Sequence, residues 1–532
     1  MNRITKVLLV FFLPLILAGV GYGWYWQKWV NENLESLLNQ NVESDYQFKL
    51  GEVDFRIFER SIFLKNLKII SLKSDTVSHV RGEIEQAFLK NVHLARLLLK
   101  KQLLIDELGF IHPTIQVNLF SNTDKKEMPE STLQHFFGDI LSKGEIKNFR
   151  LSQGAAIFYE EGARKGTAYN LGILVNGLET DSIKAQYSIP FDYQRVYFSF
   201  DSLVYEVEEG QYLRLGKMRL DSKLERLSIK NISLLYQEEL EKVARQKDFQ
   251  YDLIELKMDS LKLSGFGPEI RLDYDFDVRA RKLELFGLDL KDYRERRLPR
   301  PKDEVRPMFQ GMISQVNFPL RLDTLEIVDS QISYGESVPG SGENWTIQFK
   351  EMNGHIINLT TIPEYQTEKK NFELDLVTSL EGSGNLKAKI LVPYDKEEFF
   401  MDLDFNNYSL HHLNPMLRPI MNGEIAQGHL DRMKMTIQAN EFTANVQLIF
   451  DYRDLKVELY NKTGQKKNKL LSGLANVAIH QSNLPGDKKY LGPNYMVSRN
   501  RTRGPFHLVW KSTKEGIMQV IPGGLAKELF LP

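Results

Sequence analysis

Hydrophobic and polar residues alternate along much of the chain, most regularly in its second half. Successive side chains of a β-strand point to opposite faces, so this pattern predicts strands with one apolar and one wet face. Turn-forming stretches such as EGSGN at 381–385 separate the runs. The alternating runs cover 372–376, 386–392, 399–405, 433–439 and 446–452. We expect a mainly β fold, with an antiparallel meander as its simplest topology.

A loose internal repeat accompanies this alternation. Apolar residues recur at offsets 0, 2, 7 and 9 in units that begin at Leu108, Phe149, Leu227 and Leu325. The odd step inside each unit inverts the side-chain phase, which requires a bulge or turn. The expected positions are Pro113, Gly154, Asn231 and Ser330, and the run that restarts after Asp454 requires another. The alternative is chance similarity among β-rich segments.

The N-terminus carries the longest apolar stretch. The uncharged run at 7–27 reaches the about 20 residues that a membrane-spanning helix needs. The basic residues before it favour a cytoplasmic N-terminus, and aromatic residues at its far end favour the membrane interface. These are Arg3 and Lys6, and Trp24, Trp26 and Trp29. We therefore expect a single-pass anchor; a cleaved signal peptide ending near Gly21 is the alternative.

The remaining chain divides at one composition shift. The segment 291–310 is rich in charge and proline, and it predicts an exposed connection between β regions at 30–290 and 311–532. A basic patch for anionic headgroups is the sharper interpretation, but interleaved acidic residues favour a solvated loop. Few helices are expected: a short one after the anchor at 30–38, and others at 94–101, 131–142, 235–247 and 304–315.

Composition narrows the class of function. The chain has 532 residues, with 69 basic and 70 acidic side chains and a net charge of -1. This balance argues against a nucleic-acid-binding protein, which would carry a basic excess. The absence of Cys excludes disulfides, thiolate zinc sites and cysteine nucleophiles.

Candidate catalytic chemistry is sparse. Neither a G-x-S-x-G, a Walker A, a G-x-G-x-x-G nor a H-E-x-x-H pattern occurs. His411–His412 is a possible metal pair, but adjacent strand residues point apart, and a loop is the simpler interpretation. Asp273, Asp275 and Asp277 share a strand face, yet they fit an ordinary amphipathic strand. We expect no enzyme activity, no cofactor and no metal.

The central question is what covers the apolar strand faces. Each aliphatic or aromatic side chain left in water forgoes about 1.5–3 kcal/mol of burial free energy. The sheet either closes on its own core or curls into a trough whose lining meets lipid, and periodicity is the same in both cases. In the trough, the lining includes Leu403, Phe405, Val446, Leu448 and Phe450.

Several phrases resemble a known family. The order is an apolar N-terminus, a short helix, FKLGEVDFRIFERSIFLKNLKI at 48–69, and a strand, Leu-rich helix and x-Pro-x-Ile pattern at 82–117. Near the other end, 422–462 contains Gly-x-Leu-Asp-like and Tyr-x-Asp-Leu-Lys-Val phrases. These phrases resemble the AsmA family of envelope proteins, within the wider group of repeating β-groove, bridge-like lipid transfer proteins that includes TamB. The resemblance covers both ends well and 160–320 poorly.

The resemblance implies an elongated, curved, taco-like β-groove, with the helix at 94–101 capping its start. It implies a protein of the Gram-negative envelope, held in the cell inner membrane with the bulk of the chain in the periplasm. Its function would be to bind or conduct phospholipid-like molecules and so support envelope lipid homeostasis. The alternative is a non-enzymatic envelope assembly or scaffolding factor with a closed β core. The family offers no catalytic residues to transfer.

Overall fold

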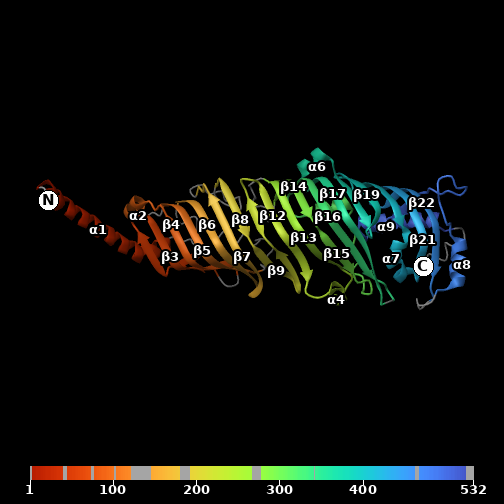
Figure 1. The fold of residues 1–532 in the computed structure, drawn as a ribbon, viewed down its shortest axis with the longest axis horizontal. Helices are drawn as coiled ribbons and strands as arrows, with labels where there is room; N and C mark the ends of the chain where they lie inside the picture. The colour runs from red at the N-terminus through yellow and green to blue at the C-terminus, as the bar shows by residue number, and fades with distance from the viewer. Residues whose placement is uncertain are drawn as a thin grey trace. The chain divides into compact units, whose positions relative to one another are not determined.

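The fold was taken from a computed structural model that describes residues 3–39, 45–73, 77–100, 104–120, 145–179, 192–266, 277–302, 304–340, 342–461 and 467–522. It is mainly β, and its strands form a large mixed sheet (Figure 1). Contacts divide the chain into two units, one made mostly of residues before 230 and one mostly of residues after it. The segment 291–310 lies inside the second unit rather than at this division.

The described residues of the first unit include two helices and the first strands. These are α1 (Arg3–Leu38), β1 (Tyr46–Lys49), β2 (Glu52–Arg56), β3 (Ser61–Ser71), β4 (His79–Lys90), α2 (Leu94–Lys100), β5 (Leu104–Leu119), β6 (Glu145–Glu160), β7 (Ala163–Asn176), β8 (Arg195–Phe200), β9 (Ser202–Glu208) and β11 (Met218–Asp221). Two further strands, β10 (Gln211–Leu215) and β12 (Arg226–Tyr236), contribute residues to both units. The helix predicted at 94–101 is confirmed as α2, and the one at 131–142 lies outside the described residues.

The predicted membrane anchor is wrong. Over the described residues, none of the helices combines the length and the hydropathy needed to cross a membrane. Beyond the predicted span at 7–27, α1 continues into a polar stretch that bonds to the sheet: Asn31 accepts from the Phe55 N–H at 3.2 Å and Glu35 from the Leu50 N–H at 2.9 Å. Leu34 on the same turns is fully buried against the strands. The separate helix expected at 30–38 is the continuation of α1.

The second unit holds the longer strands. They are β13 (Asp252–Phe266), β14 (Val278–Phe286), β15 (Asp289–Arg294), β16 (Leu320–Ser337), β17 (Asn344–Thr360), β18 (Asn371–Leu380), β19 (Ser383–Pro393), β20 (Phe399–Ser409), β21 (Gly423–Ala439), β22 (Thr443–Leu459) and β23 (Asn494–Ser498). The alternating runs predicted from 372 to 452 therefore fall on β18 to β22, which confirms them as strands.

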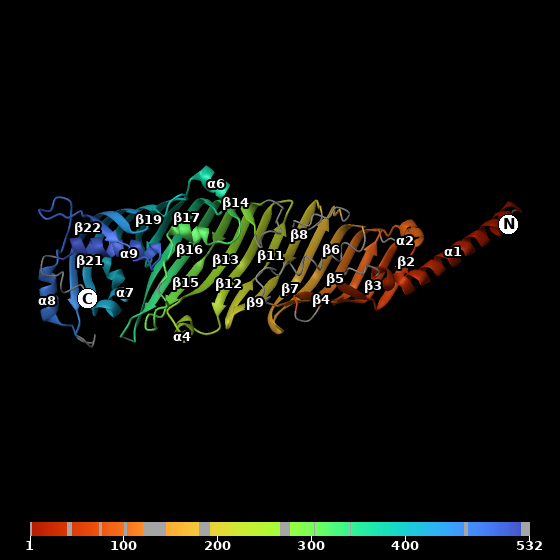
Figure 2. The same ribbon diagram turned by 180° about the vertical axis from the view of Figure 1, so that it is seen from behind.

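Helices of the second unit are short except for the last. They are α4 (Leu240–Arg245), α5 (Phe309–Ser314), α6 (Pro363–Lys369), the 3-10 turn η1 (Leu410–Leu413), α7 (Asn414–Met421), α8 (Lys469–Ala478) and α9 (Pro505–Val520). The predictions at 235–247 and 304–315 are confirmed as α4 and α5, whereas α6, η1, α7, α8 and α9 were not predicted. Figure 2 shows α9 lying across β21 and β22.

The sheet is mixed rather than a pure antiparallel meander. The pairs β5–β6, β14–β16 and β15–β16 are parallel. Parallel neighbours need a crossover connection of about a dozen residues or more. The chain supplies one between β5 and β6 and another between β15 and β16, and the second contains most of the charged segment 291–310.

The predicted phase inversions are confirmed. His112, Gln153, Asn231 and Asp329 all have positive φ, at 50°, 55°, 52° and 47°, at or one residue before the expected positions. Asp454, with φ 57°, does the same inside β22. Because each bulge inserts one residue, the apolar side chains before and after it stay on one face. In β5, for example, Phe110 and Ile115 lie in the same buried cluster.

Candidate functional site

The predicted lining residues lie together on one face of the second unit. Leu403 and Phe405 on β20 are separated from β22 by β21, whose Met435 pairs with both Leu403 and Leu448. All five predicted lining residues, Leu403, Phe405, Val446, Leu448 and Phe450, are at most 9% exposed. We name the side of the sheet that carries them the inner face.

Helix α9 covers this part of the inner face. The Tyr495 hydroxyl donates to the Ser512 carbonyl at 2.7 Å, and the Thr513 hydroxyl lies 3.7 Å from the Met435 sulfur. A Cβ at Gly516 would lie 2.6 Å from a Leu448 methyl, so the helix backbone sits directly on that side chain. Leu448 is thus core beneath a helix of the same chain.

The inner face continues over β13, β15, β16 and β17 with less cover. Cross-strand register aligns three rows of side chains on it, because alternate residues share a face. The first row is Leu256, Leu290, Ile332 and Phe349; the second is Ile254, Asp292, Tyr334 and Ile347; the third is Asp252, Arg294, Glu336 and Trp345. The first row is wholly apolar and only partly buried. Phe349 of the first row and Ile347 of the second row pack against the same core cluster as Leu448, which places the rows on the inner face.

On the opposite face, α4 packs against β13 and β15. Leu240 and Ala244 of the helix form a small buried cluster with Leu253 and Tyr293, which alternate with the inner-face residues. Glu295 lies on this side at 2% exposure. Burial would raise the pKa of Glu295, but hydrogen bonds from Arg297, at 2.6 Å, and from Ser337 outweigh it and lower the pKa to about 2.

Three members of the third row are charged, and hydrogen bonds pair them with one another or with Arg296. Arg294 donates to Asp252 from Nε at 2.6 Å, and Arg296 donates to Glu336 at 2.8 Å. The Tyr334 hydroxyl donates to the other Glu336 oxygen at 2.6 Å. Burial, together with the negative charge of Asp252, raises the pKa of Asp292 to about 7. Across these three rows, the inner face therefore changes from wholly apolar in the first row to mostly charged in the third.

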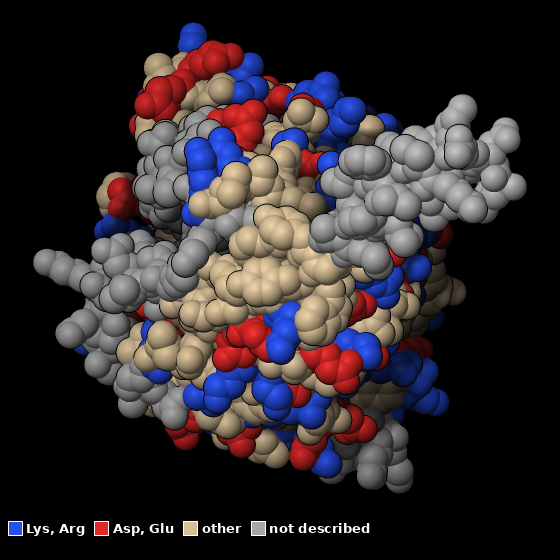
Figure 3. All heavy atoms as spheres, turned by 90° about the vertical axis from the view of Figure 1, so that its left-hand side faces the viewer, with Lys and Arg blue, Asp and Glu red and all other residues tan. Residues whose placement is uncertain are grey.

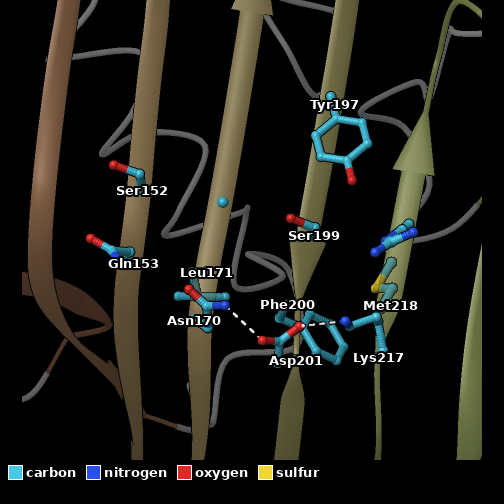
Figure 4. Close-up of a pocket in the computed structure, with 12 residues that line it drawn as sticks. Ser152, Gln153, Asn170, Leu171, Tyr197, Ser199, Phe200, Asp201, Lys217 and Met218 are labelled. Atoms are coloured by element: carbon cyan, nitrogen blue, oxygen red, sulfur yellow. Dashed lines mark hydrogen bonds and ion pairs between the residues drawn. The ribbon is translucent and has the colours of Figure 1, made fainter.

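A second candidate is a shallow hollow of about 360 Å³ in the first unit (Figure 4). Asp201 lies in this hollow. Its carboxylate accepts a hydrogen bond from the Asn170 amide at 2.6 Å and forms an ion pair with Lys217 at 3.5 Å. The hydrogen bond from Asn170 lowers the pKa of Asp201. Its lining from β6, β7, β8 and β11 is mostly polar, and its acid is already satisfied by neighbours. The hollow offers neither a nucleophile beside a base nor a set of metal ligands.

The predicted metal candidates do not assemble. His411 and His412 lie in η1 with ring centroids 4.2 Å apart, and the His411 Nδ1 atom lies 2.6 Å from the Ser409 hydroxyl. Asp277 pairs with Arg279 at 2.9 Å, whereas Asp273 and Asp275 lie outside the described residues. Nowhere in the described ranges do three His, Asp or Glu side chains gather as metal ligands.

The predicted interface tryptophans lie on α1. Trp24 is 68% exposed, while Trp26 and Trp29 are partly buried with ring centroids 5.5 Å apart. Trp29 packs against the core of the first unit. On the side where α1 begins, Figure 3 shows an uncharged area bordered by interspersed basic and acidic side chains. Only Trp24 of the three thus presents a large surface to solvent.

The charged end of the inner face was not identified from sequence. Asp292, Arg294 and Arg296 alternate with strand period directly after Leu290, and that signal was available. The high charge of 291–310 instead suggested a solvated loop. Only the register with Asp252 and Glu336, about 40 residues away on either side, shows that these residues form one surface.

Comparison with known proteins adds no assignment. The chain matches no family model, and no curated protein has a significantly similar sequence. The resemblance to AsmA-like proteins therefore stays a prediction.

Proposed function

We propose that the chain binds phospholipid-like molecules on the inner face of β13, β15, β16 and β17. The observation that carries this proposal is the first apolar row, Leu256, Leu290, Ile332 and Phe349, which the fold leaves partly exposed while it buries the equivalent face of β20 to β22. A row of aliphatic and aromatic side chains gains about 25 cal/mol per Å² when an acyl chain covers it. The AsmA-like phrases at both ends of the chain support the same function.

The apolar floor extends beyond the first row. Leu263, Leu283, Leu325 and Ile356 also pack, partly buried, against the core cluster of the inner face. Cross-strand register joins Leu263 to Leu283, Leu283 to Leu325 and Leu325 to Ile356. Two apolar rows on either side of the bulge at Asp329 give a surface for an extended chain rather than for a compact ligand.

A photo-crosslinking experiment tests this proposal. A photoreactive residue at 290 or 332 of the purified chain should capture phospholipid from vesicles. The matched controls are 291 and 333, the next residues on the same strands, which point to the opposite face. The proposal fails if the two inner-face probes capture no lipid, or no more than the two controls do.

The alternative function is a scaffold with a closed β core. One observation favours it for the end of the chain: α9 packs on the inner face of β22, so Leu448 is fully buried beneath Gly516. A probe at 448 should therefore capture no lipid under either function. Capture at 290 and 332 but not at 448 separates lipid binding from a scaffold closed throughout.

A further inference from the structure

Three charged groups at the charged end of the inner face have no ion-pair partner within the described ranges. Arg294 and Arg296 are paired with Asp252 and Glu336, as described above. Asp292, Arg300 and Arg503 remain without a carboxylate or cation at ion-pair distance. Asp292 and Arg503 both feel the charges of Arg294 and Glu336, and Arg503 also feels that of Arg300. One acid and two bases without partners around the same charged row point to a ligand that carries both signs of charge.

The acid lies between the apolar row and the charged row. Asp292 pairs across the sheet with Ile254 on one side and Tyr334 on the other, one step from Leu290. Its Oδ1 atom is buried and accepts no hydrogen bond. A buried acceptor without a donor costs about 1–3 kcal/mol. A ligand that supplies an N–H donor would remove that cost.

The two bases come from different segments: Arg503 lies in the loop before α9, and Arg300 lies in the connection after β15. The Arg503 carbonyl accepts a hydrogen bond from the Arg499 guanidinium at 3.3 Å, which fixes the loop. Burial and the charges of Arg300, Arg294 and Arg296 lower the pKa of Arg503, so these cations crowd one another next to Glu336. Helix α9 begins two residues later, at Pro505, and its N-terminus adds a further positive potential. An anion would relieve this crowding.

We propose that the charged end is a headgroup site for a zwitterionic phospholipid, with the phosphate bound by Arg503 and Arg300 and the ammonium group bound by Asp292. The acyl chains then extend over the first apolar row. This assignment rests on the proposed lipid binding and specifies its ligand class. Arginine binds phosphate oxygens through paired N–H donors, and a carboxylate binds an ammonium group by charge-assisted hydrogen bonds.

The test is competitive capture by the purified full chain at pH 8, where the Asp292 carboxyl is mainly charged. Equal amounts of phosphatidylethanolamine, phosphatidylglycerol and diacylglycerol with identical acyl chains are offered in mixed vesicles, and bound lipid is quantified by mass spectrometry. The native chain should enrich phosphatidylethanolamine about tenfold over diacylglycerol, the ratio given by about one charge-assisted contact.

Two variants assign the two halves of the headgroup. Asp292→Asn should lower phosphatidylethanolamine capture to the level of phosphatidylglycerol. Arg503→Gln should lower both phospholipids toward diacylglycerol. The control Lys291→Gln, on the opposite face of β15, should change neither ratio. Circular dichroism and total bound lipid show that each variant is folded.

The outcomes separate the two proposals. Capture of all three lipids in equal amounts overturns the headgroup site and leaves the apolar face as the lipid-binding surface. Preference for phosphatidylglycerol over phosphatidylethanolamine overturns the role of Asp292. Capture of none of the three lipids overturns the proposed function itself.

Discussion

Two regions of one sheet face share a sequence pattern and differ in what covers them. On β20 and β22, the five predicted lining residues are at most 9% exposed, and α9 packs directly on Leu448. On β13, β15, β16 and β17, the inner-face residues of the first row stay partly exposed, and α4 packs on the opposite face. Alternation therefore marks an apolar face without telling whether protein or ligand completes it.

The two regions also differ in charge. The inner face of β20 to β22 beneath α9 is apolar, whereas the inner face of β13, β15, β16 and β17 has a charged row at one end. The rows of β20 to β22 that face α9 are apolar, and the buried Tyr452 hydroxyl donates to the His480 carbonyl at 2.7 Å. The rows of β13 to β17 change from Leu290 to Asp292 to Arg294 along a single strand. A surface that is apolar at one end and charged at the other suits an amphiphile, and a uniformly apolar one suits a helix.

A matched pair of charge substitutions gives the largest expected contrast. Leu448→Asp buries an unpaired charge under α9 and should lower the free energy of unfolding by about 3–5 kcal/mol. Leu290→Asp places the same charge where water reaches it, and should cost about 1 kcal/mol or less. Urea unfolding monitored by circular dichroism measures both. Equal losses would show that the two regions are equally closed.

A matched pair of glycine substitutions tests the seal itself. Gly516→Ala adds a Cβ about 2.2 Å from the Tyr495 hydroxyl, and should destabilise the chain by about 1–3 kcal/mol through overpacking. Gly473→Ala in α8 meets no atom within 4 Å and should stabilise by about 0.5–1 kcal/mol through helix propensity. Thermal unfolding should shift in opposite directions for the two variants. A gain at Gly516 would mean that α9 does not press on the sheet.

Helix α9 shows why part of the fold escaped prediction. Its buried positions are Pro505, Leu508, Ser512, Gly516 and Val520, spaced like a helix but only partly hydrophobic. A close approach to a sheet selects small residues at the contact, so the apolar stripe that identifies most helices is missing. The strands were predictable because their apolar period of two is set by the sheet itself, and the bulges were predictable because the phase inverts at fixed spacing.

The charged end of the inner face was beyond prediction for a different reason. Asp252, Arg294 and Glu336 are separated by about 40 residues, and no local pattern states which strands pair. The crossover that allows the parallel pairing of β15 with β16 contains most of the charged segment 291–310, which the sequence pattern indicated to be only an exposed connection. The apolar faces of the strands can be predicted from neighbouring residues in the sequence. The position of their charged residues in space depends on which strands pair, and the local sequence does not specify that.

The uncovered region should also make stability depend on pH. The pKa of Asp292 rises from 3.8 to about 7 on folding, so the folded chain binds more protons between those values. Its contribution to stability therefore falls as pH rises from about 4 to about 7. Asp292→Asn removes this component, and should be more stable than the native chain at pH 8 by about 1 kcal/mol, because partial solvent exposure screens the charge. Urea unfolding at pH 4.5 and 8 measures the difference, and a pH-independent difference would contradict it.

The smallest effect is expected at the histidine pair, which lies outside both regions in η1. His411 is exposed, and its ring nitrogen pairs with Ser409 rather than with a second ligand. His411→Ala should change the free energy of unfolding by no more than about 0.5 kcal/mol, as is usual for surface substitutions. Added Zn²⁺ should shift the melting temperature of the native chain and of this variant equally, because two adjacent histidines without a third ligand make a poor site. A shift seen only with the native chain would show that His411 binds metal and would reopen a metal site at this turn.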